Sequence, residues 1–180
     1  FSAALITTMA KTICTILQAW EMMSPVNLLV TINQVLFTLM KRKKLMTAFV
    51  GHLDPQTGVL TVSSGGHLPA FHVDTAHRLT ELGRPALPLG AKKTVPANTQ
   101  ELILNPGEGL VLYTDGIVEA LDWQGRQYTF KTWEQEVQEK LPSFSRNPDL
   151  ESLLEGVRKH TAGRPFDDDV TIMVLYRDIV

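Results

Sequence analysis

The order of hydrophobic patterns along the chain predicts an α+β fold rather than an alternating parallel one. Two helix-like segments come first, a run of strand-like segments follows, and two further helices precede a last strand. Grouped helices and strands are typical of α+β domains, because parallel sheets need a helix after almost every strand. The length of 180 residues is enough for one packed core, so we expect residues 1–180 to form a single domain.

The first forty residues carry two helical stripes. Over residues 2–20 the apolar side chains recur at steps of three and four, as one face of a helix requires. A second stripe covers residues 24–40, where Ser24 is a suitable N-cap and Pro25 suits the first helical position. The basic run 41–44 then ends this helix, because positive charge is favourable at a helix C-terminus.

After residue 45 the hydrophobic period becomes that of strands. Segments 46–54 and 59–64 flank the turn sequence Asp54-Pro55-Gln56-Thr57-Gly58 and predict a β-hairpin. Further antiparallel strands are expected at 70–74, 78–82, 100–104 and 109–114, the last two joined by a turn at 105–108. Helices are expected at 129–140 and 149–160, and the β-branched run 170–176 suits a central strand.

The charge balance argues against a nucleic-acid partner. With 17 Lys and Arg against 19 Asp and Glu, the formal net charge is −2, which leaves no positive excess to neutralise phosphates. The single cysteine, Cys14, excludes an internal disulfide and a cysteine-rich metal site, which fits a reducing compartment. The longest apolar stretch, 26–40, is shorter than the roughly 18 residues that a membrane-spanning helix needs. We therefore expect a cytoplasmic protein.

Two apolar strands each carry aspartate at one end. The strand 109–114 is followed by Asp115 and Gly116, and the strand beginning at Val170 is preceded by Asp167-Asp168-Asp169. Either feature alone is usually a turn or a solvated loop. Together, carboxylates from different strands predict a hard-oxygen site for Mg²⁺ or Mn²⁺, with Gly116 allowing close approach of the backbone.

A third segment, Ser63-Ser64-Gly65-Gly66-His67-Leu68-Pro69, places a histidine among small residues. No second His or Cys stands near His67 at ligand spacing, so we expect its ring to be hydrogen-bonded in a tight turn. The sequence also lacks a cysteine-phosphatase loop, a Gly-Lys-Ser/Thr phosphate loop and a Gly-x-Ser-x-Gly elbow. The open alternatives are a metal-assisted reaction or no reaction.

Eight short motifs, spread over nearly the whole chain, carry a family resemblance by their order. They are Ser2-Ala3-Ala4-Leu5-Ile6, Ser24-Pro25-Val26-Asn27-Leu28-Leu29, Thr47-Ala48-Phe49 with its hairpin, Gly65-Gly66-His67-Leu68-Pro69, Leu87-Pro88-Leu89-Gly90, Asn105-Pro106-Gly107-Glu108, Tyr113-Thr114-Asp115-Gly116-Ile117-Val118-Glu119-Ala120 and Asp168-Asp169-Val170-Thr171. The series resembles the bacterial PP2C-like, metal-dependent serine phosphatases of the SpoIIE and RsbU type.

The resemblance implies an αββα sandwich of two antiparallel sheets flanked by helices, with a two-metal Mn²⁺ or Mg²⁺ site at one end. In the family, the ions activate a water that attacks the phosphorus of phosphoserine or phosphothreonine. Carried over by motif, Asp115 and Asp168 are the catalytic metal ligands, and Gly116 and Asp169 belong to the same metal site in a supporting role. The implied partners are a phosphoserine-bearing regulatory protein of the STAS, anti-anti-sigma type and an upstream sensor or receiver module. Such a module would make residues 2–40 a regulatory lever; the alternative is that these two helical stripes serve only as part of the core. Whether the protein forms a homodimer is left open by the sequence.

The sequence also departs from the family pattern. The family takes further metal ligands from its first strands, including an Asp-x-x-Gly-His-Gly motif directly before the helix that begins Ala-Ala. Here that helix begins at Ser2-Ala3-Ala4, and residue 1 is Phe rather than Met. We therefore expect an N-terminally truncated domain that is inactive alone, cut from an active phosphatase. The alternative is a non-catalytic scaffold or binding module, which the retention of Asp115 and Asp168 disfavours. A nuclease is disfavoured by the charge balance.

Overall fold

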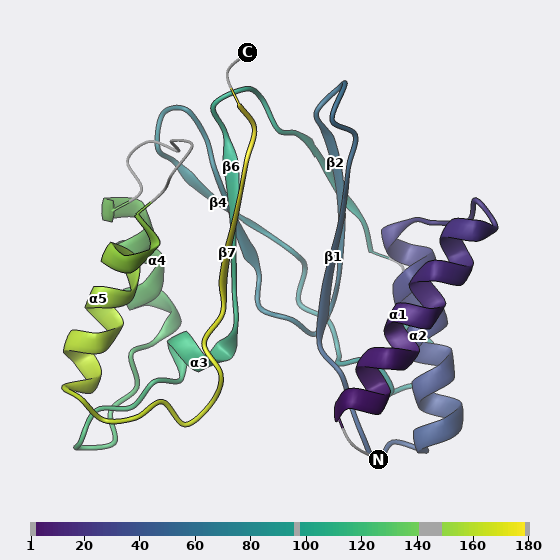
Figure 1. Ribbon diagram of the computed structural model, residues 1–180, viewed down its shortest axis with the longest axis horizontal. Helices are drawn as coiled ribbons and strands as arrows, with labels where there is room; N and C mark the ends of the chain where they lie inside the picture. The colour runs from purple at the N-terminus through teal and green to yellow at the C-terminus, as the bar shows by residue number, and fades with distance from the viewer. Residues whose placement is uncertain (1–2, 96–97, 141–148, 179–180) are drawn as a thin grey trace. The chain divides into compact units, whose positions relative to one another are not determined.

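The chain divides into two compact units. The computed structural model describes residues 3–95, 98–140 and 149–178 (Figure 1), so Ser2 of the first predicted helix lies outside the described residues. Unit 1 is Phe1–Pro69 with Leu82–Ile103, and unit 2 is Ala70–Glu81 with Leu104–Val180. The secondary structure confirms an α+β chain with two antiparallel sheets. In order, the elements are α1 (Ala3–Ala19), α2 (Pro25–Met40), β1 (Ala48–Leu53), β2 (Val59–Gly65), β3 (Ala70–Val73), β4 (Leu79–Leu82), β5 (Gln100–Ile103), β6 (Gly109–Tyr113), α3 (Asp115–Val118), α4 (Phe130–Lys140), α5 (Leu150–Thr161) and β7 (Ile172–Tyr176).

Unit 1 contains a three-stranded sheet of order β1-β2-β5. The predicted hairpin is confirmed, because β1 and β2 pair antiparallel from Ala48↔Gly65 to Leu53↔Leu60. Its turn is held by Asp54, whose Oδ1 accepts the Gln56 N–H at 2.9 Å and whose Oδ2 accepts the Thr57 hydroxyl at 2.8 Å. The helices α1 and α2 lie side by side, and α2 contacts both β1 and β2.

One buried cluster of unit 1 is formed mainly by the apolar faces of α1 and α2, the two helices that lie together in Figure 1. Ser24 caps α2 as expected, since its hydroxyl accepts the Asn27 N–H at 3.1 Å. The loop after β4 adds Leu89, which is fully buried and pairs with Met46 through two backbone hydrogen bonds. The buried members of this core are Ile13, Leu17, Leu29, Ile32, Leu36, Met40 and Leu89.

Unit 2 contains a four-stranded sheet of order β4-β3-β6-β7. The run 170–176 was expected to suit a central strand, but β7 lies at the edge of this sheet and Met173 is 56% exposed. The prediction was wrong because β-branched content measures fit to a pleated surface and not position within a sheet. The predicted turn at 105–108 also joins strands of different sheets, since β5 pairs with β2 and β6 with β3.

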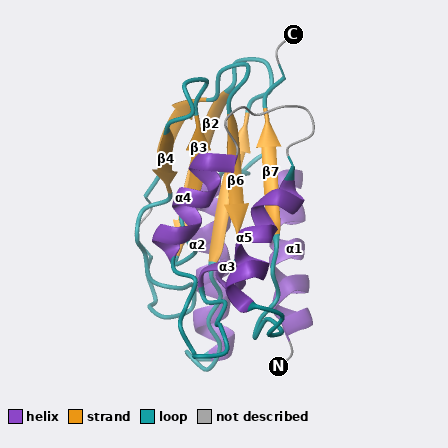
Figure 2. Cartoon of the chain, turned by 90° about the vertical axis from the view of Figure 1, so that its left-hand side faces the viewer, coloured by secondary structure: helices purple, strands orange, loops and turns teal. Residues whose placement is uncertain are grey.

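Aromatic side chains join α4 to the sheet of unit 2. Figure 2 shows α4 and α5 in front of this sheet. Trp133 of α4 is fully buried, with its ring 5.4 Å from that of Tyr113 on β6, and Phe130 lies 5.6 Å from Phe71 on β3. Burial raises the pKa of the Tyr113 hydroxyl, and nearby carboxylates add to the effect. That hydroxyl therefore stays protonated at any physiological pH.

Unit 2 uses the same turn twice. In the first, Asp74 Oδ1 accepts the N–H groups of Ala76 and Arg78, and Arg78 Nε donates to Asp74 Oδ2 at 2.6 Å. In the second, Asp122 and Arg126 repeat these contacts, again with 2.6 Å between Nε and Oδ2. These local hydrogen bonds replace a regular ladder where the chain reverses.

Among the described helices, none is long and apolar enough to span a membrane.

Candidate functional site

The first aspartate motif lies where β6 ends. Thr114 follows the strand with extended backbone, and the one-turn helix α3 begins at Asp115. Asp115 is exposed, whereas Gly116, Ile117 and Val118 are buried. The buried residues anchor the turn, and the exposed Asp115 side chain follows directly on the end of β6.

Gly116 brings the second aspartate motif against the first. A Cβ atom at this position would lie 2.5 Å from the carbonyl oxygen of Asp169 and 3.2 Å from that of Asp168. No side chain fits in this space, because real Cβ atoms do not approach a carbonyl oxygen so closely. The absence of a side chain at Gly116 therefore allows the segment before β7 to pack directly on the segment after β6.

Thr114 joins the two segments by hydrogen bonds. Its hydroxyl donates to the Asp169 carbonyl at 3.0 Å and accepts the Thr171 N–H at 2.9 Å. Its own backbone N–H donates to the Thr171 carbonyl at 3.1 Å. These contacts extend the β6–β7 ladder, which pairs Tyr113 with Ile172, by one residue. The strand ends that carry Asp115 and Asp168 thus lie side by side, as the sequence predicted.

A hollow of about 180 Å³ adjoins these segments. Its lining includes Asp168 and Gly116, but not Asp115 or Asp169. Sequence reasoning assigned no site role to Glu119 and Gln127, which also line it. Glu119 follows Asp115 by four residues and could have been found by helical spacing. Gln127 carries no local signal, since it reaches the hollow through a β-bridge to Leu121.

The three adjacent aspartates have different partners. Asp167 is paired with Arg164, with Nη1 to Oδ2 at 3.0 Å and Nη2 to Oδ1 at 3.1 Å. Asp168 Oδ1 accepts the Asp169 N–H at 2.7 Å. Arg164 offsets part of the negative charge of this run, and the carboxylate of Asp168 remains exposed beside the hollow.

The oxygen atoms of these segments are of the type that binds a hard cation, but there are too few of them to hold one. Carboxylate and backbone carbonyl oxygens are the ligands that Mg²⁺ and Mn²⁺ prefer. Within residues 3–95, 98–140 and 149–178, however, no three His, Cys, Asp or Glu side chains are grouped so that they could hold a metal ion. The assignment of Asp115, Gly116, Asp168 and Asp169 to a metal site therefore stays a prediction.

His67 has the surroundings expected of a turn residue. Its Nδ1 lies at hydrogen-bond distance, 3.0 Å, from the Leu68 carbonyl, and its own carbonyl accepts the Ser64 hydroxyl at 3.3 Å. The neighbouring Gly66 has φ +75°, and a Cβ there would lie 2.6 Å from the Pro88 nitrogen. The segment is thus a tightly packed turn of unit 1.

Solved structures with the same fold are PP2C phosphatase domains. The SiaA-PP2C domain of Pseudomonas aeruginosa matches with a TM-score of 0.76 at 19% identity, covering 97% of this chain and 70% of that one. The RsbU and RsbW domains of Rv1364c from Mycobacterium tuberculosis match with a TM-score of 0.70 at 21% identity, covering 98% and 48%. The PP2C phosphatase domain of SpoIIE with a fragment of its regulatory domain, from Bacillus subtilis, matches with a TM-score of 0.70 at 19% identity, covering 96% of this chain and 49% of that one. The chain therefore has the PP2C-type phosphatase fold.

Sequence comparison gives the family. The model of the family Stage II sporulation protein E (SpoIIE) matches residues 1–178. Protein IcfG of Synechocystis sp. (strain ATCC 27184 / PCC 6803 / Kazusa) is 29% identical over 140 residues, or 73% of this chain. The chain spans only 20% of the length of IcfG. The chain belongs to the SpoIIE family, which confirms the resemblance carried by the eight motifs.

Proposed function

We propose that the protein containing this chain is a metal-dependent protein serine/threonine phosphatase. Its substrate would be phosphoserine on a regulatory protein of the anti-anti-sigma type. The observation that supports this most is the direct contact of the two aspartate segments, in which Gly116 packs on the carbonyls of Asp168 and Asp169. The family match runs through both units, which supports residues 1–180 as parts of one domain.

In this proposal Asp115 and Asp168 hold Mn²⁺ or Mg²⁺, and Gly116 and Asp169 support them. Structures of the same fold include a SpoIIE phosphatase domain presoaked with manganese and RsbX in complex with magnesium. Bound divalent ions supply a water of lowered pKa as the nucleophile for phosphorus. Thr114 fixes the distance between the two carboxylate segments, and Arg164 keeps Asp167 out of the ligand set.

The donor set implies that other residues complete the site. Two exposed carboxylates supply few of the six or so oxygens that a divalent ion takes. We propose that the remaining carboxylates come from another part of a longer protein, which also carries a sensor or receiver module. The activity and the regulatory partner are thus proposed for the whole protein, and the 180-residue chain alone is expected to be inactive.

The test is phosphate release from a phosphoserine peptide by the whole protein, with and without Mn²⁺. We expect turnover that requires Mn²⁺ and falls at least about 100-fold in Asp115→Asn, because a negative ligand becomes neutral. Mn²⁺ affinity, measured by titration calorimetry, should fall in parallel. The control is Glu151→Gln, an exposed carboxylate of α5, which should leave both quantities unchanged.

Two results would contradict the proposal. Full activity of Asp115→Asn would remove Asp115 from the site. A folded whole protein without any Mn²⁺-dependent turnover would favour the non-catalytic scaffold instead.

A further inference from the structure

We propose that unit 1 carries a docking groove for an acidic segment of a protein partner, at the C-terminal end of α2. The groove is a hollow of about 680 Å³, within the roughly 300–1,000 Å³ that binding pockets occupy. This proposal does not rest on phosphatase activity, because Asp115 and Asp168 belong to unit 2. The lining combines cationic, hydroxyl and aromatic side chains, namely Lys41, Arg42 and Lys93, Thr38 and Thr94, and Phe37.

The buried side chain of Asn33 brings cations from distant parts of the sequence together. Asn33 is 1% exposed, and its Nδ2 donates to the carbonyls of Lys92 and Lys93, both at 3.1 Å. Its Oδ1 accepts the Gly90 N–H at 2.8 Å. The loop is therefore fixed on α2, and Lys93 lines the same hollow as Lys41 and Arg42.

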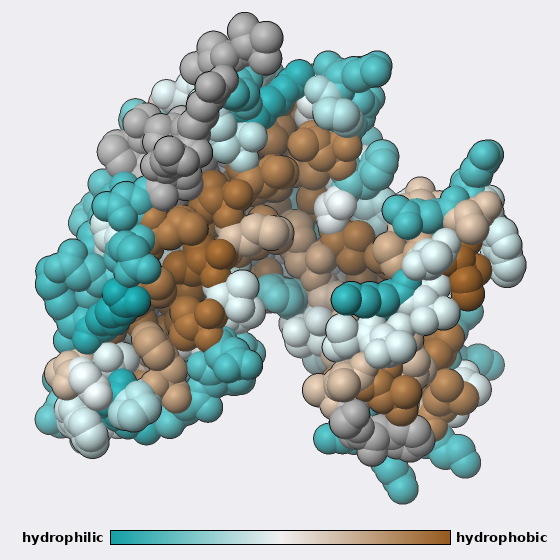
Figure 3. All heavy atoms as spheres, viewed as in Figure 1, coloured by the Kyte–Doolittle hydropathy of each residue, from teal (hydrophilic) through white to brown (hydrophobic). Residues whose placement is uncertain are grey.

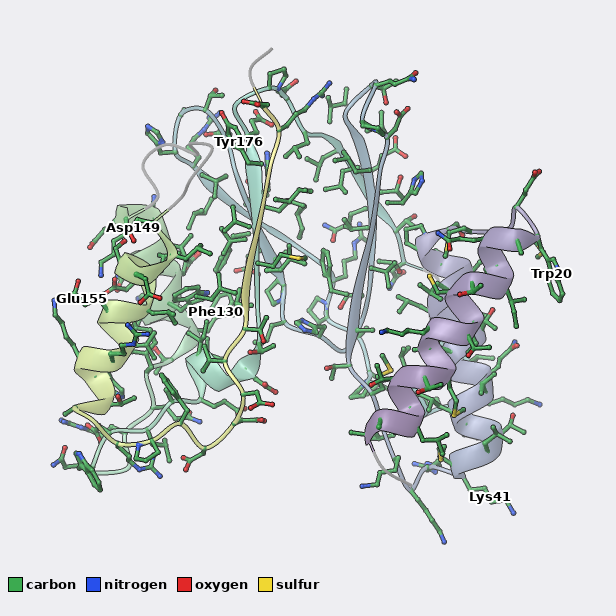
Figure 4. All side chains as sticks on the ribbon, in the orientation of Figure 1. Trp20, Lys41, Phe130, Asp149, Glu155 and Tyr176 are labelled. Atoms are coloured by element: carbon green, nitrogen blue, oxygen red, sulfur yellow. The ribbon has the colours of Figure 1, made fainter. Side chains whose placement is uncertain are left out.

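Helix capping explains only part of this cluster. Positive charge offsets the dipole at a helix C-terminus, which accounts for the basic run 41–44. It gives no reason for Lys92 and Lys93, which follow α2 by some fifty residues and reach it through Asn33. Figure 4 labels Lys41 at this end of α2, with other nitrogen-tipped side chains around it.

Positive charge is in excess throughout unit 1. Unit 1 contains eight Lys and Arg and three Asp and Glu, a formal net charge of +5. Among the described residues, no Lys or Arg of this unit forms an ion pair, whereas the ion pairs observed lie in unit 2. Charge complementarity therefore points to an anionic partner.

The groove also adjoins a second hollow. That hollow has a volume of about 720 Å³, shares Thr94 with the first and adds Lys92 to an otherwise mostly apolar wall that includes Pro85, Leu87 and Val95. Two hollows in a row, with cationic and apolar walls, fit an extended peptide that carries acidic and apolar side chains. A flat membrane surface could not enter them, and nucleic acid would require cations along a longer stripe.

The backbone of the groove permits a specific test. Lys41 and Arg42 have φ values of +47° and +66°, in the left-handed region that favours glycine after a helix. Replacing both with glycine removes two cations and suits the backbone, so a loss of binding cannot be attributed to unfolding.

The experiment measures binding of a short fluorescein-labelled peptide of alternating glutamate and leucine to the 180-residue chain by fluorescence anisotropy. We expect saturable binding at low salt that weakens at high salt. Lys41→Gly/Arg42→Gly should weaken it at least about tenfold, because charge-assisted hydrogen bonds to the peptide are lost. The melting temperature of the double variant should be unchanged or higher.

A matched variant separates the groove from general electrostatics. Lys11→Gln/Lys131→Gln changes the net charge equally at two exposed lysines outside the groove, and should weaken binding by less than about threefold. Equal losses in both variants, or binding that the glycine variant retains, would overturn the proposal. The proposal would also be overturned if the chain did not bind the acidic peptide but bound single-stranded DNA or phosphatidylserine vesicles through Lys41 and Arg42.

Discussion

One polar side chain holds a loop in each unit, and the two differ in burial. Asn33 of unit 1 is 1% exposed and binds the 90–93 loop, whereas Thr114 of unit 2 is half-buried and binds the 169–171 segment. Water can replace the partners of a half-buried hydroxyl but not those of a buried amide. We therefore expect the loss of Asn33 to reduce stability, and the loss of Thr114 to affect mainly the geometry of the candidate site.

The two units also differ in charge. The formal net charge of −2 is the sum of +5 in unit 1 and −7 in unit 2. The helices of the two units also differ in hydropathy: Figure 3 shows mostly hydrophilic spheres over α5, and pale or brown spheres over much of α1. Large apolar side chains such as Leu5, Ile16 and Trp20 are exposed on or next to α1. The net charge of the whole chain therefore does not describe either unit. The prediction that nucleic acid is not a partner used the net charge of the whole chain.

The largest stability effect is expected from Asn33→Leu in unit 1. The buried Gly90 N–H would lose its acceptor, which costs about 1–3 kcal/mol. The change in the free energy of unfolding is measured by urea denaturation, provided that the variant and the parent have the same m-value. The neighbouring variant Gln34→Leu alters an exposed position and should stay within about 0.5 kcal/mol of the parent. Equal stability of the two variants would show that the Asn33 hydrogen bonds do not hold the loop.

A smaller stability effect is expected from Thr114→Val in unit 2. This variant keeps the shape of the side chain but removes two hydrogen bonds, at a cost of about 1 kcal/mol. In the whole protein we expect kcat/KM to fall about 10- to 100-fold, since the carboxylate segments shift relative to each other. Thr114→Ser keeps the hydroxyl and should restore most of the activity. A stability loss with unchanged kcat/KM would make Thr114 purely structural.

The smallest effect is expected from pH, through Glu108 of unit 2. Burial alone would raise the pKa of this carboxyl, but hydrogen bonds from the N–H and side chain of Asn105 and from His72 outweigh it, so the pKa lies below its ordinary value of 4.5. A carboxyl whose pKa is lowered on folding stabilises the protein above pH 4.5, and this stabilisation is lost as the pH falls through the folded value.

Urea midpoints measured between neutral and acidic pH test this expectation. Glu108→Gln should flatten the fall in stability below pH 4.5, because glutamine does not titrate. An unchanged pH profile in the variant would assign the acid sensitivity to other carboxyls, such as Asp74 and Asp122, whose pKa values are also lowered, first by backbone N–H hydrogen bonds from Arg78 and Arg126.

Sequence reasoning predicted the elements that carry local signals. Ser24 and Pro25 mark the start of α2, and the Asp54 turn marks the hairpin, because these signals act within a few residues. The helix α3 was missed, since four residues are too few for a hydrophobic period. The edge position of β7 was also missed, because strand order depends on partners distant in sequence.

The candidate site was predictable to a similar degree. The aspartates at two strand ends indicated which segments meet, and the pairing of Tyr113 with Ile172 places them together. Gln127 and the 90–93 loop could not be placed, because the contacts that position them join residues without a shared local pattern, as Asn33 and Lys92 do. The metal ligand roles of Asp115 and Asp168 rest on motif resemblance and stay predictions.

The repeated turn of unit 2 shows that one pair of end residues can fix a chain reversal in two different sequence contexts. The turns at Asp74 and Asp122 share every backbone contact but differ in all three residues between aspartate and arginine. His77 even adopts a positive φ at the position that Gly125 occupies in the other turn. The aspartate and the arginine at the two ends hold the backbone of each turn, and the second turn is also tied to the end of α5 because Trp123 Nε1 donates to the Ala162 carbonyl at 3.1 Å. The same chain reversal can therefore be built around different central residues, as long as the aspartate and the arginine at its two ends are kept.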